Sequence, residues 1–194
     1  MRFTFDPRKT AQAAAWLLQR HGGRLTRGRL LKLLYLADRQ SLIDTGRPVT
    51  GDYMVSMDQG PVLSITYDLI KGKYDEPEAR AVWARYVETV PHTMQVRATH
   101  SVPMPARERF VYDNLSRYEM KVLEQVDEVY GALAWKDLSA LTHQLPEWQD
   151  PHGSSWPIDP EDILAAGGVS PERVMSIAQE AEESRRLRTL LGAV

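Results

Sequence analysis

Apolar residues recur at helical spacing over most of the chain. A run rich in Ala and Leu over residues 10–21 follows Asp6 and Pro7 and is ended by Gly22. Asp is a good N-cap, Pro is tolerated in the first helical turn, and Gly is the usual residue just past a helix end. The pattern therefore predicts a first helix that begins near Pro7.

A second helix is predicted over residues 27–45. Thr26 stands at its N-cap position, Leu30, Leu34 and Ala37 repeat on one face, and Gly46 follows its end. The short Gly-Gly connection before it has two interpretations. It is typical of an αα-hairpin, and it equally fits a helix-turn-helix whose second helix carries basic residues.

The second half of the chain is also mainly helical in pattern. Ser116 and Glu119 match a capping box and predict a helix that ends at Gly131. Cap-plus-proline pairs mark later helix starts at residues 159–160 and 170–171, and an apolar stripe is expected along the last helix. The other predicted helices lie after Gly60-Pro61, over residues 75–87 and over residues 135–143.

Three short stretches favour β-strands. They are residues 52–57, 93–97 and 100–102, with a tight turn expected at residues 98–99. Together they predict a small antiparallel sheet of two or three strands. The fold class predicted from these patterns is α+β and predominantly α-helical, in a helical domain with that small sheet.

Composition narrows the class of protein. The chain has 194 residues, of which 43% are hydrophobic and 26% are charged, with a formal charge of −2. These values are typical of a folded domain, and the absence of cysteine excludes disulfides, thiolate zinc sites and iron–sulfur clusters. No apolar run approaches the roughly 20 residues of a membrane span, so no membrane association and a cytoplasmic location are expected.

The near-zero net charge hides an uneven distribution. Residues 1–48 contain ten Lys or Arg and three Asp, which gives +7, so residues 49–194 carry −2 − 7 = −9. Two interpretations are open. The asymmetry indicates either a polar surface for a partner, such as nucleic acid or an acidic protein face, or two parts of one fold that attract each other.

Catalytic motifs are scarce. The sequence has no G-x-S-x-G, no H-E-x-x-H and no phosphate-binding glycine loop. His143, Glu147, Asp150 and His152 carry groups that ligate metals, but their spacing matches no known signature. We therefore predict no metal site, no cofactor and no enzymatic activity. A hydrolase centred on His143 and Glu147 is the weakest of three functional hypotheses.

Tryptophans divide into two groups. Trp16 and Trp83 lie within predicted helices and are expected in the core, because large aromatic side chains fill cores well. Trp148 and Trp156 lie in a predicted loop and are better candidates for a protein interface.

A series of short motifs resembles a known family. In order they are KLLYLAD at 32–38, GRPVTGDY at 46–53, MDQGPV at 57–62, YDLIK at 67–71, ALTH at 140–143 and PEW at 146–148. This order and spacing resemble the SocA-like, or Panacea, antitoxin domain family, which also includes phage-associated proteins. The resemblance implies one such domain over residues 1–150 and a helical C-terminal extension over residues 151–194, packed on the same domain.

The resemblance also implies a function. It implies an antitoxin of a bacterial or phage toxin–antitoxin system that neutralises a cognate protein toxin by direct binding, with some members acting as adaptors that deliver the toxin to a AAA+ protease. The motif positions, structural or partner-binding, are Lys32, Tyr35, Asp38, Gly46, Pro48, Gly51, Asp52, Gly60, Pro61, Tyr67, His143 and Trp148. Asp52, Tyr53, Gln59, His143 and Trp148 are the candidates for partner contact, with Asp52 expected to be exposed.

Helix geometry gives an expectation for Asp38, and the basic N-terminal residues suggest an alternative function. Tyr35 and Asp38 are three residues apart and share a helix face, where Asp38 is expected to hold a backbone N–H or an arginine. The alternative function is a DNA-binding regulator that uses Arg24, Arg27 and Arg29 of the basic N-terminal helical hairpin, and nucleic acid is a partner only in that alternative.

Overall fold

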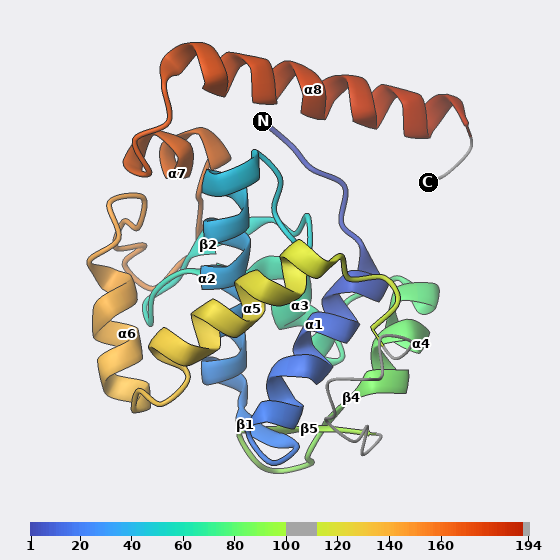
Figure 1. The fold of residues 1–194 in the computed structure, drawn as a ribbon. Coiled ribbons are helices and arrows are strands. Elements are labelled where there is room, and N and C mark those ends of the chain that lie inside the picture. The colour runs from blue at the N-terminus through green and yellow to red at the C-terminus, as the bar shows by residue number, and fades with distance from the viewer. Residues whose placement is uncertain (100–111, 192–194) are drawn as a thin grey trace.

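The computed structural model describes residues 1–99 and 112–191 (Figure 1). In this part of the chain there are eight helices and two three-stranded antiparallel sheets, so the predicted α+β, mostly helical class is confirmed. The helices are α1 Pro7–Arg20, α2 Arg27–Thr45, α3 Ser64–Lys71, α4 Pro77–Tyr86, α5 Arg117–Tyr130, α6 Trp135–His143, α7 Pro160–Ala166 and α8 Pro171–Leu190. The strands are β1 Arg24–Thr26, β2 Met54–Ser56, β3 Val62–Leu63, β4 Val87–Thr89, β5 Gln95–Ala98 and β6 Trp156–Pro157.

Helix α2 occupies the centre of the molecule, and α1, α5, α6 and α7 pack around it (Figure 1). Its predicted caps are confirmed: the Thr26 hydroxyl accepts a hydrogen bond from the Arg29 N–H, and Gly46 follows the helix with a φ of 79°. Every residue from Leu30 to Asp38 is buried. A helix that is buried all round must be covered on every side, which explains why so many elements meet it.

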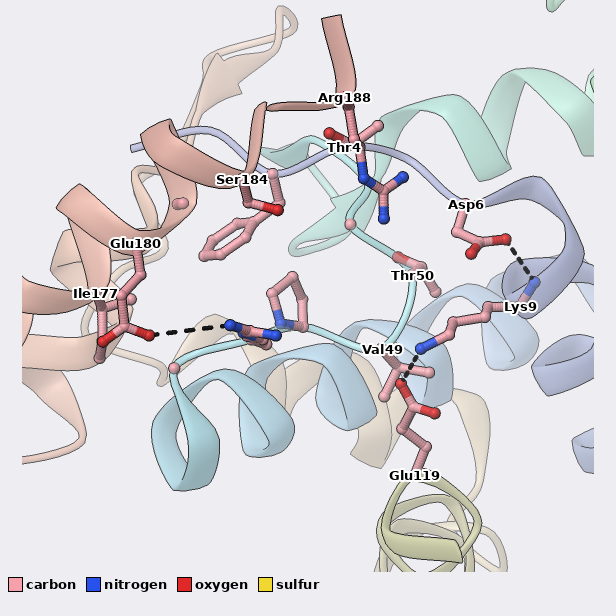
Figure 2. Close-up of a pocket in the computed structure, with 16 residues that line it drawn as sticks. Thr4, Asp6, Lys9, Val49, Thr50, Glu119, Ile177, Glu180, Ser184 and Arg188 are labelled. Atoms are coloured by element: carbon pink, nitrogen blue, oxygen red, sulfur yellow. Dashed lines mark hydrogen bonds and ion pairs between the residues drawn. The ribbon is translucent and has the colours of Figure 1, made fainter. Parts of the chain in front are cut away.

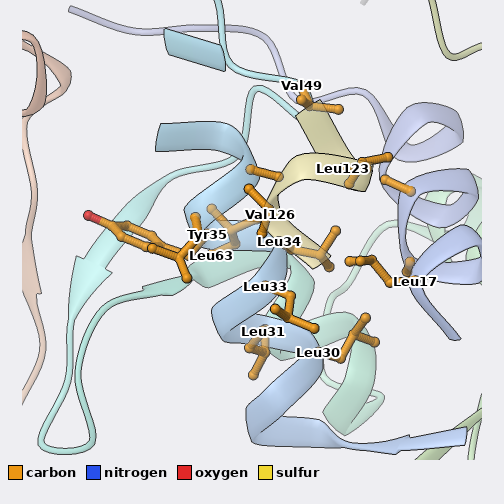
Figure 3. Packing of buried hydrophobic residues seen from close by; sticks show 14 of the residues in the cluster. Leu17, Leu30, Leu31, Leu33, Leu34, Tyr35, Val49, Leu63, Leu123 and Val126 are labelled. Atoms are coloured by element: carbon orange, nitrogen blue, oxygen red, sulfur yellow. The ribbon is translucent and has the colours of Figure 1, made fainter. Parts of the chain in front are cut away.

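The core is built from side chains that leave α2 in several directions. Figure 3 shows Leu17 of α1 on one side of α2, with Tyr35 pointing to the opposite side, and Leu123 and Val126 of α5 nearby. Leu17, Leu123 and Leu30 are fully buried. Truncating a leucine in such a site to alanine costs about 2–5 kcal/mol, so the fold depends on these contacts.

The strands form two sheets rather than the single sheet predicted. One has the order β1-β5-β4, with Leu25 opposite Val96, and the other has the order β3-β2-β6, with Val55 opposite both Val62 and Pro157. Placing residues 52–57 and 93–97 in one sheet was therefore wrong. The predicted strand at 100–102 lies outside the described residues. Strand β5 pairs with β4, which precedes it in the chain.

The C-terminal segment joins the same core. Strand β6 pairs with β2, and Ile163 and Leu164 of α7 are fully buried. Helix α8 runs across one end of the molecule above the N-terminal segment (Figure 1), and Ile177 is its one buried side chain among the described residues. The apolar stripe predicted for the last helix fails toward its end, since Leu187 is 58% exposed. The division of the chain near residue 150 stays a prediction.

No helix in the described ranges is both long and apolar enough to cross a membrane.

Candidate partner-binding site

Two buried aspartates fix the loop that follows α2. Both the N–H and the hydroxyl of Thr50 donate hydrogen bonds to the Asp38 carboxyl, with 2.9 Å between the Thr50 nitrogen and Oδ1. Asp52 accepts from the N–H groups of Ile65 and Thr66 at 2.9 and 2.8 Å, and also from the Thr66 hydroxyl. Asp52 thus caps the first turn of α3 from outside that helix, which begins at Ser64 without a capping side chain of its own.

These contacts settle two expectations. Asp38 does hold a backbone N–H, as predicted, and its donor is Thr50. The expectation of an exposed Asp52 was wrong, because its carboxyl is buried beneath the first turn of α3. A residue engaged in this way contributes to the fold and offers no free surface to a partner.

Glu147 links the late PEW motif to α2. The Tyr35 hydroxyl donates to its Oε1 at 2.9 Å, and the Arg39 Nε donates to the same oxygen at 2.7 Å. The side chain of Glu147 is fully buried and that of Arg39 is 17% exposed. Arg39 was not among the predicted site residues. Its position one helical turn after Tyr35, on the same face of α2, was the available signal.

His143 and Trp148 hold the loop of residues 57–61. The His143 ring donates to the Asp58 carbonyl at 3.1 Å, and the Trp148 indole N–H donates to the Met57 carbonyl at the same distance. The two rings also pack against each other, with 4.3 Å between their centroids. Both side chains are partly exposed, so this pair combines a structural role with an accessible aromatic surface.

Burial shifts the pKa of several groups in this network. It raises the pKa of Asp38 to about 7, against the opposing effect of the Thr50 hydrogen bonds, and it also raises the pKa of Asp52. The pKa of Tyr35 is raised well above its usual value by burial and by the adjacent Glu147. Burial lowers the pKa of Lys32 to about 7.

A pocket of about 340 Å³ opens beside this network, between the start of α2, the 57–60 loop and α3. Three motif residues, Lys32, Gly60 and Tyr67, line it. Gly60 has a φ of 91°, and a Cβ there would come within 2.8 Å of the Lys32 Nζ. The glycine is therefore required both by its backbone conformation and by the closeness of the lysine.

The 46–51 motif borders a second, more polar pocket of about 190 Å³ beneath α8 (Figure 2). Gly51 has a φ of 70°, and a Cβ on it would overlap the Thr4 carbonyl oxygen. Pro48 lies in the same loop, and the Lys9 Nζ is 2.5 Å from a carboxylate oxygen of Glu119. Because charges around this pocket already neutralise one another, the first pocket is the better candidate for binding.

Two segments next to β2 carry exposed aromatic side chains. Tyr53 directly precedes β2 and is 50% exposed, and Trp156 of β6, paired with β2, is 48% exposed. We call Tyr53, Gln59, His143, Trp148 and Trp156 the β2 surface. Trp16 and Trp83, in contrast, are buried in the core as predicted.

Part of the uneven charge is neutralised within the fold, since four of the ten cations in residues 1–48 pair with later carboxylates. Cations of residues 1–48 pair with carboxylates of the later chain, in the pairs Lys9–Glu119, Arg20–Asp127, Arg39–Glu147 and Arg47–Glu180. Two parts of one fold attract each other, which is the second of the two interpretations given above.

The geometry disfavours the helix-turn-helix interpretation. Strand β1 lies between α1 and α2 and pairs with β5, with Arg24 opposite Arg97. The Arg29 guanidinium donates to the Gly131 carbonyl, and Arg27 contacts the Met94 sulfur. A recognition helix needs a free face for the major groove, whereas α2 is buried on all sides from Leu30 to Asp38.

The contacts of His143 and Glu147 also disfavour the hydrolase hypothesis. Glu147 is occupied by Tyr35 and Arg39, while His143 contacts a backbone carbonyl. Within residues 1–99 and 112–191, no group of three or more His, Asp or Glu side chains is placed to hold a metal ion.

Comparison with protein families agrees with the motif order. The family model described as antitoxin SocA-like, Panacea domain, matches residues 30–149, which is more than half of the chain. The chain belongs to this antitoxin family. No curated protein and no solved structure matches it. The matched range includes α2 from Leu30 onward, both glycine-containing motif loops and the His143–Trp148 pair, and it ends before β6.

Proposed function

We propose that the protein is an antitoxin that neutralises a cognate protein toxin by direct binding, without catalysis of its own. Membership of the SocA-like family over residues 30–149 is the observation that carries this proposal. The contacts of the motif residues support it, because they tie α2, α3 and α6 into one scaffold instead of forming a reactive site.

We place the toxin on the β2 surface and over the mouth of the adjoining pocket. Large aromatic side chains are frequent hot spots of protein interfaces, and Tyr53 and Trp156 are both about half exposed. Gln59 is shared by the β2 surface and the pocket lining. A partner bound here would rest on a rigid base, since His143 and Trp148 anchor the loop that carries Gln59.

Co-expression tests the function itself. The product of the reading frame that adjoins the gene is expressed alone and together with this protein, and growth is measured. We expect growth arrest from the neighbour alone and rescue by the pair. A neighbour that is harmless alone would count against an antitoxin role at that locus.

Surface variants test the location. Tyr53→Ala and Trp156→Ala are expected to abolish rescue and complex formation in a pull-down, whereas Val129→Ala, an exposed apolar residue on α5, should leave both intact. Full rescue by the Tyr53 and Trp156 variants would refute the location and leave the antitoxin function standing.

The amount of toxin in the rescued cells separates two modes of action. Neutralisation by binding alone leaves the toxin present in a stable complex. The second mode is delivery of the toxin to a AAA+ protease, as the family resemblance implies. It would shorten the toxin's half-life only when the antitoxin is present.

A further inference from the structure

The pocket beside the 57–60 loop has a buried cation in its wall. Lys32 is 1% exposed, and its Nζ donates to the Pro61 carbonyl at 2.6 Å. In the described part of the chain this carbonyl is the one hydrogen-bond acceptor of Lys32, and none of the ion pairs there includes Lys32. An ammonium group has three protons to donate, and burying it without a counter-ion is unfavourable. Lys32 is therefore incompletely satisfied in the free protein.

The remaining charges of the pocket also favour an anion. Arg27 and Lys71 line it together with a single carboxylate, that of Asp58. The Asp58 carboxylate accepts a hydrogen bond from the Gly153 N–H at 2.9 Å, and the Lys71 Nζ lies 4.2 Å from the centre of the Tyr67 ring. With Lys32 protonated, three cations face one anion, which leaves an excess positive charge for a ligand to neutralise.

The walls decide what kind of anion fits. Half of the lining residues other than glycine have apolar side chains, and they are Leu31, Met57, Val62, Ile70, Met94 and Trp135. A phosphate would bring a second charge and several unpaired acceptors against these walls, which is unfavourable. A carboxylate needs a single cation, and an apolar group attached to it would cover the walls.

Two glycines shape the space. A Cβ at Gly60 would lie 2.8 Å from the Lys32 Nζ, and a Cβ at Gly28 would lie 2.5 Å from the Trp135 ring. Glycine at position 60 leaves room for the Lys32 ammonium and the Thr142 hydroxyl, and Gly28 lets Trp135 lie against α2. The volume of about 340 Å³ is at the lower end of the range for small-molecule sites.

We propose that this pocket is a binding site for a carboxylate that carries an apolar group. The carboxylate accepts a hydrogen bond from Lys32, and the apolar group packs against Leu31, Ile70 and Trp135. The inference goes beyond the antitoxin function and is tested separately from it, since its probes are small molecules and no toxin is required. The same chemistry occurs in free apolar acids and at the C-terminal residue of a polypeptide.

Calorimetric titration of the full chain tests the proposal with two pairs of probes. The first pair is 3-phenylpropionate and its amide, and the second is N-acetyl-L-phenylalanine and its amide. Each acid is expected to bind at least about tenfold more tightly than its amide, since a hydrogen bond to a charged group is lost in the amide. Tighter binding of the first acid would identify a free acid as the ligand, and tighter binding of the second a chain terminus.

Lys32→Met should remove the preference for acid over amide, and Lys73→Met, an exposed lysine outside the pocket lining, should leave it unchanged. Equal binding of acid and amide by the unaltered protein would overturn the proposal. Binding of inorganic phosphate as tight as that of the acids, or no binding of either acid, would also overturn it.

Proton uptake gives a second measurement that needs no variant. Because burial lowers the pKa of Lys32 to about 7, a bound carboxylate that raises this pKa should cause proton uptake at pH 8. Titration in buffers of different ionisation enthalpy measures it. The other titratable or charged groups that line the pocket are Arg27, Asp58, Tyr67 and Lys71. Absence of uptake at pH 8 would refute the role of Lys32.

Discussion

The contact between Arg39 and Glu147 is expected to stabilise the fold far more than a surface ion pair does. Glu147→Gln keeps the size of the side chain and an acceptor for the Tyr35 hydroxyl, but it leaves the largely buried Arg39 guanidinium without a counter-charge. Removing one partner of a buried pair costs about 3–5 kcal/mol. Because the amide oxygen still accepts one hydrogen bond, we expect the lower end, about 3 kcal/mol.

A double-mutant cycle isolates the pair. Arg39→Met is expected to lower the free energy of unfolding by a similar amount. If the two losses simply added, the double variant would lose about 6 kcal/mol. We expect a loss of about 3 kcal/mol, because the double variant leaves no unpaired charge buried. The coupling energy is thus about 3 kcal/mol. Urea unfolding followed by tryptophan fluorescence measures each free energy of unfolding, and the chain supplies five tryptophans for the signal.

The matched control is the exposed pair Arg97–Glu88 on β5 and β4, whose side chains are 47% and 43% exposed. Arg97→Met and Glu88→Gln should couple by at most about 1 kcal/mol. A coupling energy between Arg39 and Glu147 no larger than that of the control would refute the argument that burial makes this contact strong.

Four further variants test other parts of the fold. Gly51→Ala combines a positive φ with overlap of the Thr4 carbonyl, so a loss of more than about 1 kcal/mol in urea unfolding is expected. Ser116→Ala removes the acceptor of the capping box and should cost about 1 kcal/mol, visible as a lower Tm. The pKa of Lys32 in the folded state is lowered to about 7, so the unfolded state binds more protons between pH 7 and 10.5 and the free energy of unfolding rises across that window. The pKa of Asp38 is raised to about 7, so the folded state binds more protons between pH 3.8 and 7 and the free energy of unfolding falls across that window. Urea unfolding at pH 5, 7 and 9 measures both effects. Lys32→Met should lose the rise in the free energy of unfolding above pH 7, and Asp38→Asn should lose the fall below pH 7.

Unaltered stability of Gly51→Ala or Ser116→Ala would contradict the strain and capping arguments. Retention of both pH slopes in the two charge variants would show that other groups cause them.

Local signals in the sequence predicted the helices well. Asp6, Thr26 and Ser116 are side-chain caps in the structure, and Gly46 ends α2 as expected. Such caps depend on residues within one helical turn, so the sequence around them contains the necessary information. The fold class could be predicted because most of the chain belongs to helices with such local signals.

The pairing of strands that are far apart in the chain could not be predicted from local signals. Strand β1 has three residues and depends on β5, about 70 positions later, so no local pattern revealed it. The two-residue strand β6 likewise depends on β2. Strands this short are defined by their partners and carry almost no periodicity of their own.

For the candidate site, the sequence suggested candidate residues, and the exposure expected for Asp52 was wrong. Lys32 and Asp52 are polar, and polarity usually indicates exposure, yet both are buried. The run of apolar residues on either side of Lys32 was a usable sign that this part of α2 is covered all round. The contact between Asp52 and the start of α3 could not be read from spacing, because it joins two separate elements.

The position of α1 has a consequence for how this protein can be rearranged in evolution. The family match begins at residue 30, whereas α1, which lies before it, contributes Ala11, Ala14, Leu17 and Leu18 as fully buried side chains. A gene fusion cut at the edge of the recognisable segment would leave a large apolar groove open to water. The smallest portable module is therefore longer than the segment that sequence comparison detects. A new neighbour joined at residue 30 would have to supply a replacement helix for the fold to survive.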